Sequence, residues 1–237
     1  MSRAESRGKR RKLATGFAIL VMSLIFHKAS LCEPVRHPHP LLQTGDRLPK
    51  ILFPNSLTPE ESNYLGIGKR KAFSLDEIKG RLILIEFMNT NCMYCIKAIP
   101  KFDEIYQTIQ QDPALNKGVK MVAVGAGDTL SEVENFKSNY RIAYPILPDA
   151  EYKAHKAVGE PRVPFLLIAK KDNRGRWIIA RTQVGLIGTL ESETPIYFDE
   201  DWRVPDAQGT SSLRSFIEEL RTILATDPKT LRLKGAK

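Results

Sequence analysis

The sequence predicts an α/β fold in which helices cover a mixed central sheet. Two observations support this prediction. Uninterrupted apolar runs, such as "LILI" at 82–85, alternate along the chain with amphipathic patterns of helical spacing, and such runs are typical of strands buried on both faces. A Cys-x-x-Cys pair, Cys92 and Cys95, follows the first of these runs. At 237 residues the chain is long enough for one domain with a sizeable core.

The N-terminus has the pattern of an export signal. Residues 1–12 contain six basic residues and one acid, and the uncharged segment "LATGFAILVMSLIF" follows at 13–26. We therefore expect an exported protein, in the periplasm or at the outer face of the cytoplasmic membrane. Residues 1–32 are either a cleaved signal peptide or a signal-anchor. Cleavage is slightly favoured, because the apolar run is shorter than the roughly 20 residues of a spanning helix. Cys32 follows a leucine instead of a small residue, which argues against a lipoprotein.

Charge argues against nucleic-acid binding. The whole chain has a formal net charge of +9, but residues 1–32 hold seven basic residues and one acid, which leaves +3 for residues 33–237. No basic stripe with interleaved aromatic residues remains, so we expect no nucleic-acid partner. Export permits disulfides. Outside the expected leader, which contains Cys32, the chain has two cysteines, Cys92 and Cys95. They are too close in sequence for a disulfide between them to link distant parts of the chain.

The elements are expected in the following order. An extended lead-in at 33–70, rich in proline and turn residues, contains a short strand near 51–53, and the domain proper covers 71–237. It begins with "FSLDEIKG", in which Ser74 and Glu77 have capping-box spacing, so one or two helical turns are expected. The strand "LILIEF" and the helix "CIKAIPKFDEIYQTIQQ" follow, with Pro100 expected to kink that helix.

The second half continues the alternation. We expect a buried strand "VKMVAVG", a helix "LSEVENFKSNY", the short extended "AYPILPD" and a helix "AEYKAHKAVG". "VPFLLIAK" and "GRWIIARTQVG" are expected to form a hairpin, and "SLRSFIEELRTIL" a final helix. The acidic segment at about 186–210 is too long for a simple connection. It is either a functional flap or a decoration of the domain.

These landmarks together resemble the thioredoxin fold, and they are most similar to the TlpA/ResA group of exported thiol–disulfide oxidoreductases. The resemblance covers about 72–224 and rests on "FSLDEIKG", "LILIEF", the Cys92–Cys95 pair, Pro100 and "RVPFLLI". It implies a thioredoxin-like three-layer α/β/α sandwich with a mixed central sheet. It also implies protein thiols and disulfides as substrates and a membrane electron donor that regenerates the dithiol. We expect no cofactor and no metal.

The two cysteines are expected to have different roles. Cys92 lies at the first turn of the expected helix, where the helix dipole and unpaired N–H groups favour a thiolate, so it is expected to be the nucleophile. Cys95 lies three positions further on, on the same face and near enough to form a disulfide with Cys92. Cys92 is expected to attack a partner's disulfide, and Cys95 to resolve the mixed disulfide.

The resemblance adds a substrate-binding surface. It implies a cis peptide bond before Pro164, which faces the cysteines, and backbone groups of Val163 that pair with a substrate strand. The alternative is an ordinary trans proline at the start of a strand. Tyr94 and Phe165 are assigned to the same surface, and Phe165 is expected to enlarge the apolar area beside Cys92.

Glu86 lies in the expected buried strand, six residues before Cys92. Burial is costly for a carboxylate and raises its pKa, which suits Glu86 to take or deliver the proton of Cys95. Thioredoxins resemble this arrangement, with an acid at the matching position. The alternative carries equal weight: Glu86 faces a water-filled gap or edge and only solubilises it.

The direction of electron flow stays open, because Asn91, Met93 and Tyr94 depart from the relatives and the residues between the cysteines tune the reduction potential. By resemblance a reductant is favoured, with cytochrome c maturation as one pathway. A copper chaperone of the same fold and a non-catalytic binding domain are the alternatives. Copper chaperones use C-x-x-x-C, one residue longer than the spacing here. Peroxiredoxins place a threonine three residues before the attacking cysteine, whereas Thr90 lies two before Cys92.

Overall fold

The computed structural model describes residues 40–185 and 209–234, all of which belong to the unit Pro38–Lys237. The predicted export signal lies outside the described residues, as does nearly all of the acidic segment at 186–210. No helix in the described ranges is long and apolar enough to cross a membrane.

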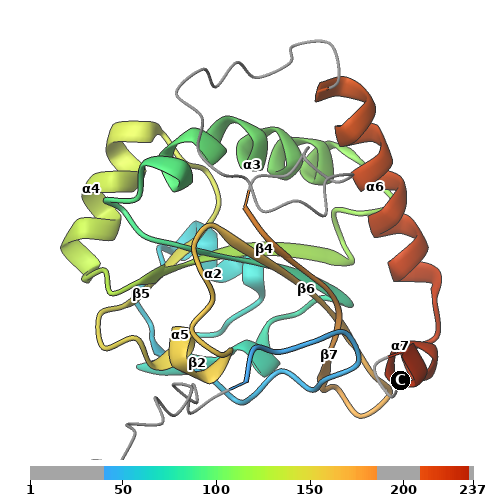
Figure 1. Ribbon diagram of the computed structural model, residues 1–237. Coiled ribbons are helices and arrows are strands. Elements are labelled where there is room, and N and C mark those ends of the chain that lie inside the picture. The colour runs from blue at the N-terminus through green and yellow to red at the C-terminus, as the bar shows by residue number, and fades with distance from the viewer. Residues whose placement is uncertain (1–39, 186–208, 235–237) are drawn as a thin grey trace, which may run out of the picture. The chain divides into compact units, whose positions relative to one another are not determined.

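A five-stranded mixed sheet lies at the centre, in the order β5-β4-β3-β6-β7 (Figure 1). The middle strand β3 (Leu82–Met88) pairs in parallel with β4 (Val119–Ala126) and antiparallel with β6 (Phe165–Lys171). β5 (Ile146–Asp149) extends the parallel side and β7 (Trp177–Val184) the antiparallel side. All seven residues of β3 are buried, which explains its unbroken apolar run.

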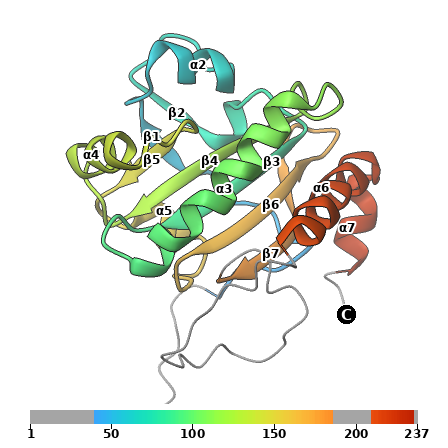
Figure 2. The ribbon, with the colours of Figure 1, turned by 90° about the horizontal axis from the view of Figure 1, so that it is seen from above.

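Helices cover both faces of this sheet. Side chains of α3 (Met93–Gln111), α4 (Leu130–Tyr140) and α6 (Gly209–Ala225) form one core against the first face. Figure 2 shows α3 running across the sheet with α6 beside it. The second core joins the opposite face to α5 (Lys153–Ala157) and to residues 48–78. The predicted thioredoxin-like three-layer α/β/α arrangement is confirmed.

The segment before β3 is more structured than the predicted lead-in. It contains a two-stranded antiparallel sheet, a helix and a single 3-10 turn: β1 (Leu52–Pro54), α2 (Pro59–Leu65), β2 (Ala72–Ser74) and η1 (Leu75–Glu77). The capping box of Ser74 and Glu77 is formed, as predicted. The helix α2 is not among the predicted elements, although Thr58 and Glu61 form the same kind of capping box.

A buried lysine of β6 fixes the C-terminal end of α6. The last carbonyl oxygens of this helix, those of Ile223 and Leu224, accept hydrogen bonds from the buried Lys170 ammonium of β6 over 2.8 and 2.7 Å. A further short helix, α7 (Pro228–Lys234), follows α6 and is not among the predicted elements. The lysine satisfies carbonyls that a helix end leaves without partners.

Candidate active site around Cys92 and Cys95

The two cysteines begin α3, just after the carboxyl end of β3. Cys92 is the N-cap residue, and the backbone N–H of Cys95 donates a hydrogen bond to its Sγ over 3.4 Å. Both residues are free thiols, Cys92 half-buried and Cys95 only 1% exposed. An N–H donor at a helix N-terminus stabilises a negatively charged sulfur. The geometry therefore gives Cys92 the access that a nucleophile needs and shields Cys95 from solvent.

Burial also makes Cys95 hard to ionise. It raises the pKa of the Cys95 thiol well above the ordinary value, and the neighbouring Cys92 and the charge of Glu86 raise it further. A thiol in this state reacts only if a nearby group accepts its proton. An acidic side chain that lies close to Cys95 in the core beneath α3 is therefore a candidate for this proton acceptor.

Glu86 is such an acid and faces the same core as Cys95. Its side chain is 3% exposed, and its carboxylate accepts a hydrogen bond from the Tyr144 hydroxyl over 3.3 Å. Burial raises the pKa of Glu86 to about 8, although the hydrogen bond from Tyr144 acts to lower it. An edge position or a water-filled gap does not fit so buried a side chain on the central strand. Tyr144 is not among the predicted site residues.

Val163 and Pro164 lie beside Cys92. The peptide bond between them is cis, as the resemblance implied. Cys92 Sγ lies 3.8 Å from the carbonyl oxygen of Val163, to which the thiol donates. On the preceding loop, the carbonyl oxygen of Pro161 lies 2.8 Å from His155 Nε2 of α5. The structure thus brings Val163 and Pro164 to the cysteines from a segment about seventy residues further along the chain.

A buried aspartate holds the loop before Cys92. Asp128 is 1% exposed, and its carboxylate accepts hydrogen bonds from the Thr90 backbone N–H (3.0 Å), the Thr90 hydroxyl (2.8 Å) and the Asn89 amide (3.0 Å). Asn89 in turn accepts hydrogen bonds from the backbone N–H groups of Asn91 and Cys92, each over 3.0 Å. Asp128 is therefore connected to the N-cap of α3 through a continuous set of hydrogen bonds. Sequence reasoning did not identify it.

Two glycines make room around Asp128. A Cβ at Gly125 would lie 2.7 Å from Oδ2 of Asp128, closer than real Cβ atoms approach other atoms. Gly127 has a φ of 82°, in the left-handed region, and a Cβ there would overlap the Tyr152 hydroxyl. The sequence "VGAGD" at the end of a strand was therefore a signal by which Asp128 could have been found.

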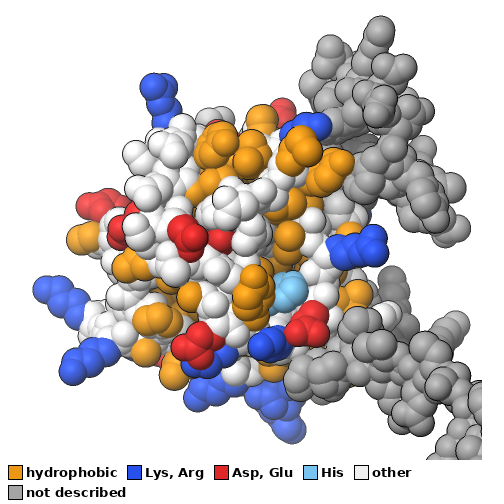
Figure 3. Space-filling view, turned by 60° about the vertical axis from the view of Figure 1, so that its left-hand side comes forward, with side chains coloured by type: hydrophobic (Ala, Val, Ile, Leu, Met, Phe, Trp, Pro, Cys, Tyr) orange, Lys and Arg blue, Asp and Glu red, His pale blue; other side chains and the backbone are white. Residues whose placement is uncertain are grey.

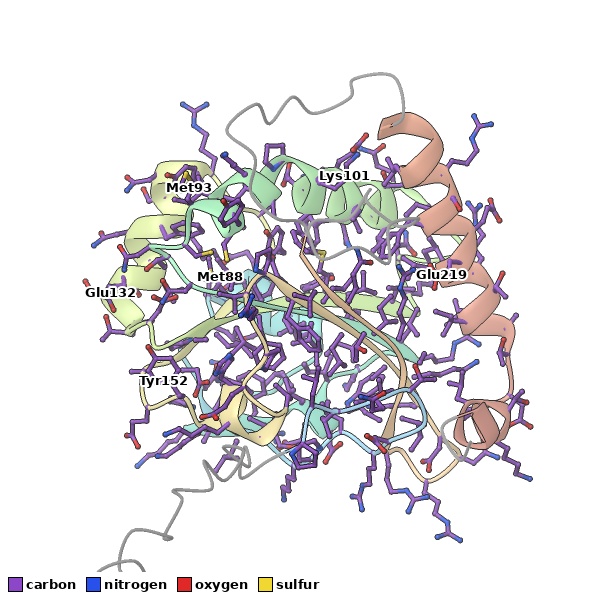
Figure 4. The ribbon with its side chains drawn as sticks, in the orientation of Figure 1. Met88, Met93, Lys101, Glu132, Tyr152 and Glu219 are labelled. Carbon is purple, nitrogen blue, oxygen red and sulfur yellow. The ribbon has the colours of Figure 1, made fainter. Side chains whose placement is uncertain are left out.

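Apolar side chains are exposed on the same side of the molecule as Cys92. Met93, the first residue of α3, is 59% exposed, and Figure 4 shows it above the buried Met88 in that view. Tyr94 is half-buried, with Lys97 Nζ 5.6 Å from its ring centroid. Figure 3 shows the side of the molecule that lies to the left in Figure 1, where several hydrophobic side chains lie close together in the upper part of the view. Exposed apolar patches of this kind are typical of surfaces that bind proteins.

Phe165 requires a correction. Its side chain is fully buried in the second core, where its ring centroid lies 6.2 Å from that of Phe87. It lies against the face of the sheet opposite to α3, and so it does not enlarge the apolar surface beside Cys92. Side chains alternate between the two faces of a strand. Phe165 is on the same face of β6 as Leu167 and Ala169, which belong to the second core.

Metal ligands are not grouped in the described part of the chain. No set of three or more His, Cys, Asp or Glu residues there is close enough to hold a metal ion.

Comparison with known proteins agrees with the geometry. Residues 56–184 match the AhpC/TSA family, which is more than half of the chain and includes both cysteines and Pro164. The chain belongs to the AhpC/TSA family. Within this family it is similar to curated proteins named thiol-disulfide oxidoreductase ResA. That of Bacillus thuringiensis (strain Al Hakam) is 28% identical over 127 residues, which are 53% of this chain and 70% of the relative. That of Bacillus subtilis (strain 168) is 25% identical over 104 residues, 44% and 55% of the two chains.

Solved structures support the fold assignment of this AhpC/TSA protein. The crystal structure of a putative thiol:disulfide interchange protein DsbE from Chlorobium tepidum superposes with a TM-score of 0.50 at 16% identity, covering 78% of this chain and 99% of that one. A hypothetical protein from Sinorhizobium meliloti 1021 gives a TM-score of 0.50 at 19% identity, covering 75% and 83%. At these identities the likeness concerns the fold alone.

Proposed function

We propose that this protein is an exported thiol–disulfide oxidoreductase whose Cys92–Cys95 dithiol reduces disulfides in other exported proteins. The enzyme class follows from the family and from the ResA relatives. The proposal is carried by one observation: an accessible thiol at the N-cap of α3 is paired with a buried thiol one turn later, beside the Val163 carbonyl. The basic and apolar N-terminal segments support export.

The reaction consists of two exchange steps. The Cys92 thiolate attacks one sulfur of the partner's disulfide, so that a mixed disulfide forms and the other partner sulfur leaves as a thiolate, which takes up a proton. Cys95 then gives its proton to Glu86, and its thiolate attacks Cys92 Sγ. The bond between Cys92 and the partner breaks, and the second partner sulfur leaves as a thiolate, which takes up a proton. Two electrons have moved to the partner, which now has two thiols, and Cys92 and Cys95 form a disulfide.

Glu86 has the properties that the second step requires. Its carboxylate must be ionised often enough to accept a proton, yet basic enough to take one from a thiol. A pKa of about 8 meets both conditions near neutral pH. Glu86 is the proton acceptor in this proposal, and its charge already acts on Cys95.

The partner is expected to bind across the start of α3. The exposed Met93 and the half-buried Tyr94 offer apolar contacts, and backbone groups of Val163 beside Cys92 are suited to an extended segment of a partner. Regeneration of the dithiol needs two electrons from a donor, for which we propose a membrane protein. Cytochrome c maturation is one pathway that such a reductase would serve.

Two measurements test this proposal. The first is reduction of insulin disulfides by the dithiol form, which should be lost in Cys92→Ser and retained in Met88→Leu, a buried change outside the reacting pair. Absence of activity in the wild-type dithiol would remove the enzyme assignment. The second is alkylation of free thiols in intact cells with a mass tag. A mostly reduced Cys92–Cys95 pair is expected, and a mostly oxidised pair would contradict the reductant direction.

A further inference from the structure

Tyr144 is a buried tyrosine whose hydroxyl reaches Glu86. It lies two residues before the start of β5, is 2% exposed, and donates from its hydroxyl to Oε2 of Glu86 over 3.3 Å. Its ring packs against Tyr106 of α3, with 5.8 Å between the ring centroids. Among the described residues, no other hydrogen bond to the Glu86 carboxylate is found.

In the described part of the chain, Tyr144 is the one hydrogen-bond donor to the Glu86 carboxylate, and no cation acts on it. Its neighbours on the adjacent strands are Ala123 of β4 and Leu166 of β6, which carry no charge. On α3, the charges of Asp103 and Cys95 act on Tyr144, and the ring of Tyr106 packs against it; none of these groups is a cation. The Tyr144 hydroxyl is therefore the stabilising contact of this carboxylate.

Tyr144 stays protonated while Glu86 titrates. Burial raises the pKa of Tyr144 well above its ordinary value, and the charge of Glu86 raises it further. The phenol is consequently a hydrogen-bond donor throughout the pH range of the exchange reaction. A buried carboxylate without such a donor is costly.

We propose that Tyr144 is a positioning residue of the exchange reaction: its hydroxyl holds the Glu86 carboxylate as the proton acceptor for Cys95. This inference rests on the proposed function and adds to it the group that keeps the acceptor available near neutral pH. When Cys95 gives up its proton, the proton moves to the Glu86 carboxylate, which becomes a carboxylic acid. Without the hydroxyl, Glu86 retains its proton to higher pH and cannot accept another.

The central test compares Tyr144→Phe with Tyr64→Phe. Tyr64 is a matched control because its buried hydroxyl accepts a hydrogen bond from the Met121 N–H over 2.8 Å and does not touch Glu86. The rate at which Cys95 resolves a Cys92–glutathione mixed disulfide is measured from pH 5 to 10. In Tyr144→Phe the midpoint of this profile should move upward by about one pH unit, because a hydrogen bond to an ionised group has roughly that effect. The rate at pH 7 should fall about tenfold, and the deficit should shrink at higher pH.

A double-mutant cycle with Glu86→Gln separates positioning from a general loss of structure. If Tyr144 acts through Glu86, adding Tyr144→Phe to Glu86→Gln should leave the pH profile of that variant unchanged. An upward displacement that persists without Glu86, or an equal displacement in Tyr64→Phe, would overturn the proposal.

A measurement on the wild type covers the case in which Tyr144→Phe does not fold. The ¹³Cζ resonance of Tyr144 should titrate with the same midpoint as the ¹³Cδ resonance of Glu86, and independent midpoints would refute the coupling. These outcomes are distinct from failure of the proposed function. If the proposed function is wrong, the wild-type dithiol does not reduce disulfides at all, whatever the behaviour of Tyr144.

Discussion

Glu86 should make the protein less stable as the pH rises, and Glu86→Gln should remove this effect. The folded-state pKa of about 8 lies above the ordinary value of 4.5, so the folded protein keeps a proton that the unfolded chain loses. The stability is therefore complete below pH 4.5 and falls as pH rises toward 8. Glutamine does not ionise and still accepts the hydrogen bond from Tyr144.

The magnitude follows from the two pKa values. Each pH unit between them costs about 1.4 kcal/mol of unfolding free energy. At pH 7 the accumulated cost of ionising the unfolded but not the folded state is about 3 kcal/mol. Glu86→Gln should therefore be more stable than the wild type by about this amount at pH 7, and by very little at pH 4.5.

Urea unfolding of the reduced proteins at several pH values measures this difference. Glu134→Gln, a change at an exposed position of α4, serves as the control and should follow the wild type at every pH. The reasoning fails if the advantage of Glu86→Gln at pH 7 is under about 1 kcal/mol, or if it does not grow with pH. The same variant should resolve mixed disulfides about a hundredfold more slowly, which is the usual contribution of a general base.

Three further predictions concern the rest of the site and the fold. Cys95→Ser should accumulate a stable mixed disulfide between Cys92 and a partner, seen as a larger species on non-reducing gels; no such species in a partner-containing extract would speak against the proposed order of attack. Asp128→Asn places an amide donor against the Thr90 N–H, so urea unfolding should show a loss of about 1–3 kcal/mol, together with a changed rate of Cys92 alkylation. An unchanged alkylation rate would mean that Asp128 stabilises the fold but does not affect the reactivity of Cys92. Lys170→Met removes the donor to the last carbonyls of α6 and should lower the free energy of unfolding by about 2 kcal/mol. A variant as stable as the wild type would contradict this role of Lys170.

The helices and strands were largely predictable because their signals are local. The unbroken apolar run of β3, the capping box of Ser74 and Glu77, and the helix from Leu130 to Tyr140 all appear where the sequence places them. Such signals depend on residues within about one helical turn or on one strand. The helix α2 has the same kind of signal and was obscured by the prolines around it.

The site was predictable in part. Cys92 and Cys95 follow from their spacing, and the cis bond before Pro164 follows from the resemblance. Asp128 and Tyr144 were not predicted, because a buried aspartate after a strand and an isolated tyrosine have many structural uses.

By itself, the sequence determined the order of the central sheet's strands along the chain and the helical start at Cys92. The tertiary structure decided which buried acids meet which partners. Glu86 and Tyr144 are 58 positions apart, and Asp128 and Thr90 are 38 apart, so their contacts depend on how strands and helices pack. The tertiary structure also turned Phe165 away from the cysteines. A change of one residue in the pairing register moves every side chain of a strand to the other face of the sheet. The register of β6, and with it the face on which Phe165 lies, is fixed only when the sheet is assembled.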